Sequence, residues 1–299
     1  MTTPDLSVVV PSVNGPPILF ECLDALLRES ASGARLEVIV VDRLGPAVRS
    51  AVAARFPAAV VVPADAGATI PEMRALAFDR ATGDAVAVIE DHVIVPDGWA
   101  RQMLESLLSG HDVVGGSVEN AATGTTTDWA AFLCEYSHLL PPIPGGEVDA
   151  LTGNNVVYRR SLLERYRATI AKGRWEDYLH AAMRRDGVRL VCHPEIVVGH
   201  KMHYRVRDYV GQRYLYARAY AGLRVAGAGA ARRFAMTLGA LVLPPVLFVR
   251  IVRRVAAKPA YRPTLVRSLP LLVLFVTAWA AGEIVGYSAG SGNALARVT

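Results

Sequence analysis

The stretch Asp84–Trp99 reads DAVAVIEDHVIVPDGW, and it decides the fold. Five apolar residues at 85–89 end abruptly on the polar triplet Glu90-Asp91-His92, and apolar residues resume at 93–95. A short, valine-rich apolar run bounded by glycine and proline is typical of a buried strand in a parallel sheet. Ligands of open α/β sheets bind just beyond the carboxyl ends of such strands. The triplet is therefore predicted to point into a functional site.

The residues before this stretch alternate between predicted strands and predicted helices. Strands are expected at Leu6–Pro11, Glu37–Asp42 and Ala59–Val62. Helices are expected after each of them, the third at Pro71–Thr82, and a further helix is expected from Asp97, a residue type favoured at N-caps. This alternation predicts a doubly wound, parallel α/β sheet with right-handed crossovers.

Polar residues also follow the first two predicted strands. Asn14 lies just beyond the first strand, and Asp42 ends the second. Each has an ordinary explanation by itself, because Asn favours turns and Asp favours helix caps. Together with the triplet they would line one edge of one sheet, which favours a shared site. The chain contains neither a GxGxxG motif nor a Walker loop, so dinucleotide-binding and P-loop folds lack their phosphate-binding loop.

The pattern changes after residue 113. A strand with a glycine pair is expected at 113–118, and small polar loops are expected at 121–127 and 141–146. A helix is expected to open near Glu176-Asp177 and to close at Gly187. Acidic residues in the first turn of a helix often do no more than complement its dipole, so this pair has a structural explanation beside a catalytic one.

The composition indicates one large α/β domain with an apolar appendage. The chain has 299 residues and is 52% hydrophobic, with the excess near the C-terminus. Arginines cluster after residue 200 beside apolar stretches, which indicates an anionic membrane surface rather than nucleic acid. The three cysteines, Cys22, Cys134 and Cys192, have no CxxC spacing, which argues for a reducing compartment and against a disulfide framework or a zinc site. No signal peptide is expected.

The C-terminal third is predicted to contact a membrane. Residues 208–225 mix tyrosine and arginine, which suits a membrane interface and equally suits a helix packed on the catalytic domain. Two apolar stretches, 234–252 and 269–287, approach the ~20 residues of a spanning helix. Basic residues lie between them, and Pro244-Pro245 interrupts the first. We expect the first stretch either to enter the membrane and turn back at its proline pair or to lie in the membrane interface. The second stretch is expected to span the membrane or also to turn back. The alternative is two full crossings, with the basic loop outside the cell.

Five motifs, read in order, resemble the inverting nucleotide-sugar glycosyltransferases of family 2. They are VVVPSVN, EVIVVD, ATGDAVAVIEDHVIVPDGW, TGNNVVYRRSLL, and WEDYLHAAMRRDGVRL followed by VVGH, all within residues 6–204. The resemblance implies a GT-A domain at 1–205, with a Rossmann-like, mostly parallel sheet. An interfacial amphipathic helix or linker would follow at 206–233, and a membrane-associated helical hairpin at 234–299.

The resemblance also assigns roles by position. Asp42 would contact the nucleobase, and Asp177 would be the general base with Glu176 beside it. The other expected donor-binding residues are Pro11, Val13, Asn14, Arg74, Glu90 and Asp91. A divalent Mn²⁺ or Mg²⁺ would be held by Asp91, His92 and His200. The expected acceptor or diphosphate side comprises Asn154, Asn155, Arg174, Trp175, Gln212 and Arg213.

Two positions depart from the family pattern. Arg43 follows Asp42 where the family has a second acid, which alters the expected contact with the base. His92 stands at the last position of the metal-binding motif, where the family has an aspartate. A nitrogen ligand suits Mn²⁺ better than Mg²⁺, which prefers oxygen ligands.

The expected function is transfer of a sugar, with inversion, from a UDP- or GDP-linked donor to a lipid-linked acceptor. A polysaccharide or small glycosyl acceptor is the first alternative, and a non-catalytic, membrane-bound nucleotide-sugar-binding or scaffold protein is the second. A nucleotidyltransferase would need a basic loop after the first strand, and residues 12–17 contain no Lys or Arg. The expected location is the cell membrane, with the catalytic domain facing the cytoplasm. Nucleic acid is not an expected partner, and homo-oligomerisation is left open.

Overall fold

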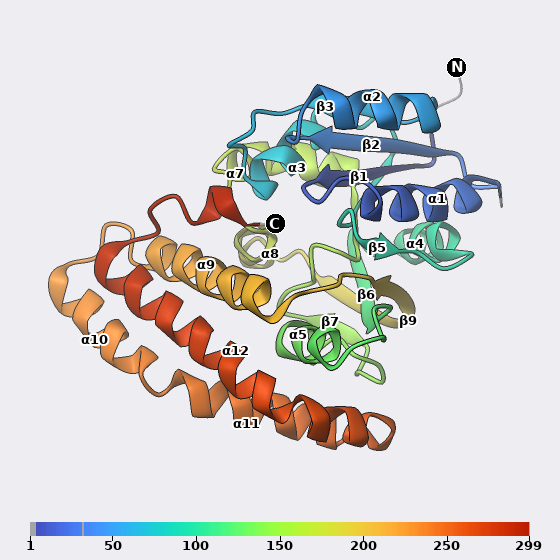
Figure 1. Cartoon of the computed structure of the whole chain (residues 1–299). Coiled ribbons are helices and arrows are strands. Elements are labelled where there is room, and N and C mark those ends of the chain that lie inside the picture. Colours follow the sequence, from blue (N-terminus) through green and yellow to red (C-terminus); the bar gives the residue numbers. More distant parts are fainter. Residues whose placement is uncertain (1–3, 32, 299) are drawn as a thin grey trace. The chain divides into compact units, whose positions relative to one another are not determined.

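The computed structural model describes residues 4–31 and 33–298, which fall into two compact units (Figure 1). The first unit comprises the residues up to Ala121 together with Leu139–Lys201. The second comprises Ala122–His138 and the residues from Met202 onward. The change of unit at Lys201–Met202 lies close to the predicted boundary at residue 205. Segment 122–138, which sequence reasoning placed in the first domain, belongs to the helical second unit.

Among the described residues, the first unit holds one nine-stranded sheet, with spatial order β3-β2-β1-β4-β8-β6-β9-β5 and with β7 paired to β9. The pairs β1–β2, β1–β4, β2–β3 and β6–β9 are parallel, and β8, β5 and β7 join antiparallel. The strands are β1 (Leu6–Ser12), β2 (Leu36–Asp42), β3 (Val60–Pro63), β4 (Ala85–Val88), β5 (Val93–Ile94), β6 (Val113–Asn120), β7 (Gly146–Val148), β8 (Val156–Arg159) and β9 (Leu190–His200). The predicted α/β class is confirmed.

The helices of the first unit include those of the predicted alternation and two short ones, α6 and α7, that were not expected. They are α1 (Ile18–Ala31), α2 (Pro46–Arg55), α3 (Ile70–Phe78), α4 (Trp99–Leu108), α6 (Arg160–Arg165), α7 (Arg167–Ile170) and α8 (Glu176–Arg185). The expected N-cap of α4 at Asp97 is wrong, because Gly98 takes that place with φ 84°. Glu29 of α1 supplies the carboxylate instead, accepting the backbone N–H groups of Gly98 and Ala100 at 2.6 and 2.8 Å. A buried anion there stabilises the helix N-terminus.

A glycine lets β6 and β9 pair closely near the functional edge. The register between these parallel strands shifts at Gly116/Ser117. A Cβ built on Gly116 would lie 1.9 Å from the carbonyl oxygen of Ile196, a distance that no side chain tolerates. β9 then continues for several residues and ends at His200. Glycine at this position is therefore required for the path of β9.

The second unit is helical (Figure 1). Its elements are α5 (Thr126–Tyr136), α9 (Val206–Arg224), α10 (Ala230–Ala240), α11 (Leu243–Ala256), η1 (Pro259–Tyr261), α12 (Arg262–Ala289) and η2 (Leu295–Arg297). Helix α5 begins inside the predicted loop 121–127, because the hydroxyl of Thr125 accepts the backbone N–H of Asp128 as an N-cap.

By length and composition, one described helical segment could cross a membrane. It is Pro259–Ala289, which contains α12. Helices α10 and α11 would together form a second candidate, but they are bent by 51° at the break before the proline pair. Large apolar side chains are exposed on all three helices, among them Phe234, Val249 and Val273. This pattern suits contact with lipid.

Substitution Gly116→Ala tests the close approach of β6 and β9. We expect it to lower the free energy of unfolding by about 3 kcal/mol, because the added methyl group forces the strands apart. The free energy would be measured by urea unfolding of the full chain in detergent. Gly67→Ala is the matched control, because its Cβ would meet no atom within 4 Å. Equal stability of the two variants would contradict the close approach.

Candidate active site

Polar side chains meet at the edge of the sheet where β1, β2 and β4 end. Ser12 and Asp42 are register partners at the ends of β1 and β2, and the hydroxyl of Ser12 donates to Asp42 at 3.0 Å. The second oxygen of Asp42 accepts the backbone N–H of Gly45 at 3.0 Å and Nη1 of Arg49 at 3.3 Å. Asp42 is completely buried. Its hydrogen bonds to Ser12, Gly45 and Arg49 hold the edge of the sheet in place. Its predicted contact with a nucleobase stays a prediction.

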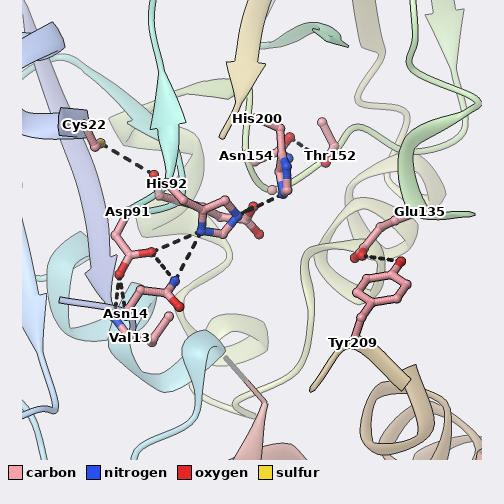
Figure 2. A network of polar contacts seen from close by, with 12 residues as sticks. Val13, Asn14, Cys22, Asp91, His92, Glu135, Thr152, Asn154, His200 and Tyr209 are labelled. Atoms are coloured by element: carbon pink, nitrogen blue, oxygen red, sulfur yellow. Dashed lines mark hydrogen bonds and ion pairs between the residues drawn. The ribbon is translucent and has the colours of Figure 1, made fainter. Parts of the chain in front are cut away.

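The carboxylate of Asp91 fixes the turn that follows β1 (Figure 2). One oxygen accepts the backbone N–H groups of Val13 and Asn14 at 2.8 and 2.7 Å. The other accepts the side-chain amide of Asn14 at 2.8 Å and lies 3.2 Å from Nδ1 of His92. Asp91 is completely buried. Hydrogen-bond donors of the chain itself therefore balance the charge of Asp91. Val13, Asn14 and Asp91, all predicted to bind the nucleotide sugar, are joined by these hydrogen bonds.

Strand pairing brings His92 and His200 together. Val93 of β5 is the register partner of His200 of β9, and the backbone N–H of Lys201 donates to the carbonyl of His92 at 2.9 Å. The two imidazoles consequently face each other with their Nε2 atoms 3.0 Å apart (Figure 2). Nε2 of His92 also lies 3.3 Å from a carboxylate oxygen of Glu90.

The electrostatics of this group favour a positive charge on His92 and a neutral His200. Burial alone would lower the pKa of His92, but Asp91 and Glu90 outweigh it and raise this pKa to about 10. Burial and the charge of His92 lower the pKa of His200 to about 3. Burial opposes ionisation of Glu90, yet its hydrogen bond to His92 and the nearby cationic groups lower the pKa of Glu90 to about 2. These shifts place a proton on His92 beside the carboxylates of Glu90 and Asp91.

The described residues Glu90, His92 and His200 could hold a metal ion. Each offers one ligand atom, and these atoms all lie within 4.8 Å of one another. Two nitrogens bound to one ion at about 2.1 Å and at a right angle would be about 3.0 Å apart, which matches the two imidazoles. One carboxylate oxygen and two imidazole nitrogens suit Mn²⁺ better than Mg²⁺. Glu90 stands in this group where sequence reasoning expected Asp91, because Asp91 is committed to the turn.

Arg74 and Glu176 form an ion pair that links α3 to the start of α8. Nη1 of Arg74 donates to Glu176 at 2.6 Å, and Nη2 donates to the carbonyl of Gly153 at 2.9 Å. The other oxygen of Glu176 accepts the backbone N–H of Gly153 at 2.9 Å. Burial opposes the charge of Arg74, but Glu176 and Glu90 outweigh it and raise its pKa. Arg74, expected on the donor side, therefore clamps the loop before β8 to α8.

Sequence reasoning missed His180, which holds the same loop. Its Nδ1 accepts the backbone N–H of Leu151 at 3.3 Å, so Nε2 carries the proton and donates to the hydroxyl oxygen of Tyr158 at 2.8 Å. Burial lowers the pKa of His180 to about 4 and keeps it neutral. The signal was its position four residues after Glu176, on the same face of the helix.

The two asparagines of the loop have different roles. Asn155 is completely buried. Its side-chain oxygen accepts the indole N–H of Trp99, and its side-chain NH₂ donates to the backbone carbonyls of Ser117 and Ile196. These bonds make Asn155 a structural residue, so the expected ligand contact does not fit its surroundings. Asn154 is also buried, but its Nδ2 has no hydrogen-bond partner among the described residues. Asn154 keeps a donor that a ligand could use.

The remaining predicted residues lie on α8 and α9. Asp177 is in the first turn of α8 with its side chain exposed, Trp175 is buried, and Arg174 stacks on Tyr178 with 4.6 Å from its guanidinium carbon to the ring centre. Gln212 and Arg213 lie on α9 in the second unit, where Nη1 of Arg213 pairs with Glu135 at 3.0 Å. The predicted metal ligands belong to the first unit, so the expected role of these two residues at the acceptor or diphosphate side stays a prediction.

Comparisons with known proteins bear on the family and the fold of the chain. The family model described as "Glycosyl transferase family 2" matches residues 7–167. Among curated proteins, none matches the chain. A solved mannosyltransferase, PcManGT from Pyrobaculum calidifontis in complex with GDP-Man and Mn²⁺, is 19% identical, with a TM-score of 0.52 over 98% of this chain and 78% of that one. GalNAc-T7 with UDP, GalNAc and Mn²⁺ is 12% identical, with a TM-score of 0.54 over 68% of this chain and 44% of that one. At these identities the likeness establishes the GT-A fold.

His92→Ala and His200→Ala test the metal-binding group. Each should weaken Mn²⁺ binding at least about tenfold, because each removes one of three predicted ligands. Binding would be measured as the loss of the free Mn²⁺ signal in electron paramagnetic resonance, which requires no catalysis. His111→Ala is the control, since His111 contacts His193 outside the group. Unchanged Mn²⁺ affinity in both variants would rule out this site.

A double-mutant cycle tests the clamp between Arg74 and Glu176. Arg74→Met should lower the free energy of unfolding by about 3 kcal/mol, because it leaves the mostly buried carboxylate of Glu176 without its counter-charge. Adding Glu176→Gln should cost little more. The measurement is urea unfolding of the full chain, with Arg80→Met, at an exposed position of the same unit, as the control. Simple additivity of the two changes would argue against the clamp.

Proposed function

Because the chain belongs to glycosyl transferase family 2, we propose that it transfers a sugar, with inversion, from a nucleotide-sugar donor to an acceptor carried by a membrane lipid. The observation that carries the proposal is the group Glu90, His92 and His200 beside the ends of β1, β2 and β4. Ligands of open α/β sheets bind at this edge. The two solved neighbours, with GDP-Man and UDP respectively, support a GDP- or UDP-linked donor.

The leaving nucleoside diphosphate sets the first chemical requirement. Its phosphates gain negative charge as the bond to the sugar breaks, and a divalent cation bound there would stabilise that charge. We assign the cation, Mn²⁺ before Mg²⁺, to Glu90, His92 and His200. Both neighbours were solved with Mn²⁺. Nδ2 of Asn154 and the turn at Val13–Asn14 would contact the nucleotide sugar directly.

The attacking acceptor hydroxyl sets the second requirement, a base that takes its proton. Inversion is a single displacement, so the proton must leave as the hydroxyl attacks. Both oxygens of Glu176 already accept hydrogen bonds from Arg74 and Gly153, which suits a positioning role. Asp177 follows it in the first turn of α8 with an exposed carboxylate. We therefore assign the base to Asp177, and we assign to Glu176 and Arg74 the placement of the helix end that carries it.

The acceptor assignment rests on the helices of the second unit. α12 is long and apolar enough to cross a membrane, and α10 and α11 expose apolar side chains. A transferase held at a membrane meets acceptors whose lipid part is embedded there, such as polyprenyl phosphates or lipid-bound glycans. The arginines between residues 250 and 267 favour a catalytic unit on the cytoplasmic side of the cell membrane.

The proposal is tested by release of nucleoside diphosphate from a panel of GDP- and UDP-sugars. The full chain in detergent would be assayed with Mn²⁺ or with chelator, and with or without polyprenyl phosphate. We expect release from one donor class that requires both metal and lipid. Asp177→Asn should lower kcat at least about 100-fold, the usual contribution of a general base.

The matched control is Asp149→Asn, the same change at an exposed residue paired with Arg184. It should leave kcat within about twofold. Donor binding without turnover under all conditions would instead support a non-catalytic nucleotide-sugar-binding protein. Full turnover in Asp177→Asn would refute the assignment of the base, and lipid-independent transfer to a soluble glycan would refute the lipid-linked acceptor.

A further inference from the structure

A pocket of about 380 Å³ lies within the second unit, between helices α5, α9, α11 and α12. Its size falls in the range that small-molecule sites occupy. It shares no residue with the metal-binding group. Its lining combines arginines with aliphatic and aromatic side chains, a combination that the transferase chemistry above does not use.

The charges in this pocket do not balance. Four arginines line it, Arg213, Arg224, Arg250 and Arg254, together with two glutamates, Glu135 and Glu283. Arg213 pairs with Glu135 at 3.0 Å, and Arg224 pairs with Glu283 at 3.2 Å. Within the described chain, no carboxylate forms an ion pair with either Arg250 or Arg254. Two positive charges are therefore in excess.

The pocket lining also holds a buried N–H group that lacks a hydrogen-bond acceptor among the described residues. The side chain of Arg213 is only 9% exposed, and its Nε has no hydrogen-bond partner among the described residues. The guanidinium is held in place by Glu135 and by the indole ring of Trp279, whose centre lies 4.2 Å from its central carbon. Leaving a buried N–H unpaired costs free energy that an oxygen ligand in the pocket would recover.

The residues of α11 that line the pocket are all apolar at the start of the helix, and arginines join them toward its end. Leu243, Val246 and Leu247 lie at one end, and Arg250, Ile251 and Arg254 lie at the other. Their spacing places them all on one face, over about 16 Å of helix. Such a surface matches an amphiphile, with a hydrocarbon chain against the leucines and an anionic group against the arginines.

The basic end continues beyond α11. Partial burial and the charge of Arg254 lower the pKa of Lys258, which lies two residues after the helix. Lowering by a like charge indicates that cations crowd here. Arginine forms charge-assisted, often bidentate bonds with phosphate, and its charge does not depend on pH in the physiological range.

We propose that this pocket binds the phosphate headgroup of a membrane lipid. Arg250, Arg254 and Nε of Arg213 contact the phosphate oxygens, and Leu243, Val246 and Leu247 contact the first part of the lipid chain. The site does not depend on the proposed transferase activity, because every observation that supports it lies within the second unit. A soluble phosphate ester presents the same headgroup without the chain, and the experiment separates the two.

The test measures the thermal unfolding midpoint of the delipidated full chain in neutral detergent. Three probes are titrated: dioctanoyl phosphatidate, dioctanoylglycerol and inorganic phosphate. The phosphatidate should raise the midpoint saturably, dioctanoylglycerol should not, and inorganic phosphate should act only at far higher concentration. In the double variant Arg250→Gln/Arg254→Gln the phosphatidate should bind at least about tenfold more weakly, because two charge-assisted bonds are lost.

The matched control is Arg253→Gln/Arg267→Gln, which removes the same charge from residues of the same unit that do not line the pocket. It should bind phosphatidate like the wild type. Equal weakening in both double variants, or equal stabilisation by dioctanoylglycerol, would overturn the proposal. Inorganic phosphate binding as tightly as the lipid would overturn it in favour of a soluble ligand. Failure of sugar transfer with intact lipid binding would count against the transferase assignment alone.

Discussion

The pairing of β5 with β9 is the contact on which the candidate active site depends. β5 has only two residues, yet the register of Val93 with His200 places His92 against His200. These two side chains are 108 positions apart in the sequence, and their imidazole nitrogens lie 3.0 Å apart. The path of β9 depends in turn on Gly116, where any side chain would meet the carbonyl of Ile196. Backbone geometry, more than side-chain attraction, brings His92 and His200 together.

Buried carboxylates organise the first unit around these two histidines. Glu29 accepts N–H groups at the start of α4, Asp42 accepts those near the end of β2, and Asp91 accepts those of the turn after β1. Each is satisfied by donors of the chain, as a buried charge must be. A carboxylate used in this way is not free to bind a ligand. These three acids therefore act as structural residues of the first unit.

The second unit exposes apolar side chains and also contains many arginines. Several of these arginines are held in place by ion pairs. Arg213 and Arg224 each pair with a glutamate inside the helical unit, and Arg213 also stacks on Trp279. Helix α5 comes from the middle of the sequence and supplies one of these glutamates, Glu135. The C-terminal helices are therefore not an independent appendage, since part of their charge balance is encoded between β6 and β7.

Local patterns in the sequence indicated β1 to β4, β6, several helices and the candidate edge of the sheet, but not β7, β8 or β9. The predicted strand 6–11 differs from β1 by one residue, and both the predicted second strand and β2 end at Asp42, because apolar runs and turn residues act over a few positions. The resemblance to family 2 further indicated which side chains to examine. It did not reveal that Glu29 caps α4, that Arg74 clamps Glu176, or that Glu90 rather than Asp91 joins the two histidines. Those arrangements depend on strand register and on contacts between residues far apart in the chain, and such contacts leave no periodicity in the sequence. Only the tertiary structure decided which acids became structural, because their hydrogen-bond donors come from distant parts of the chain.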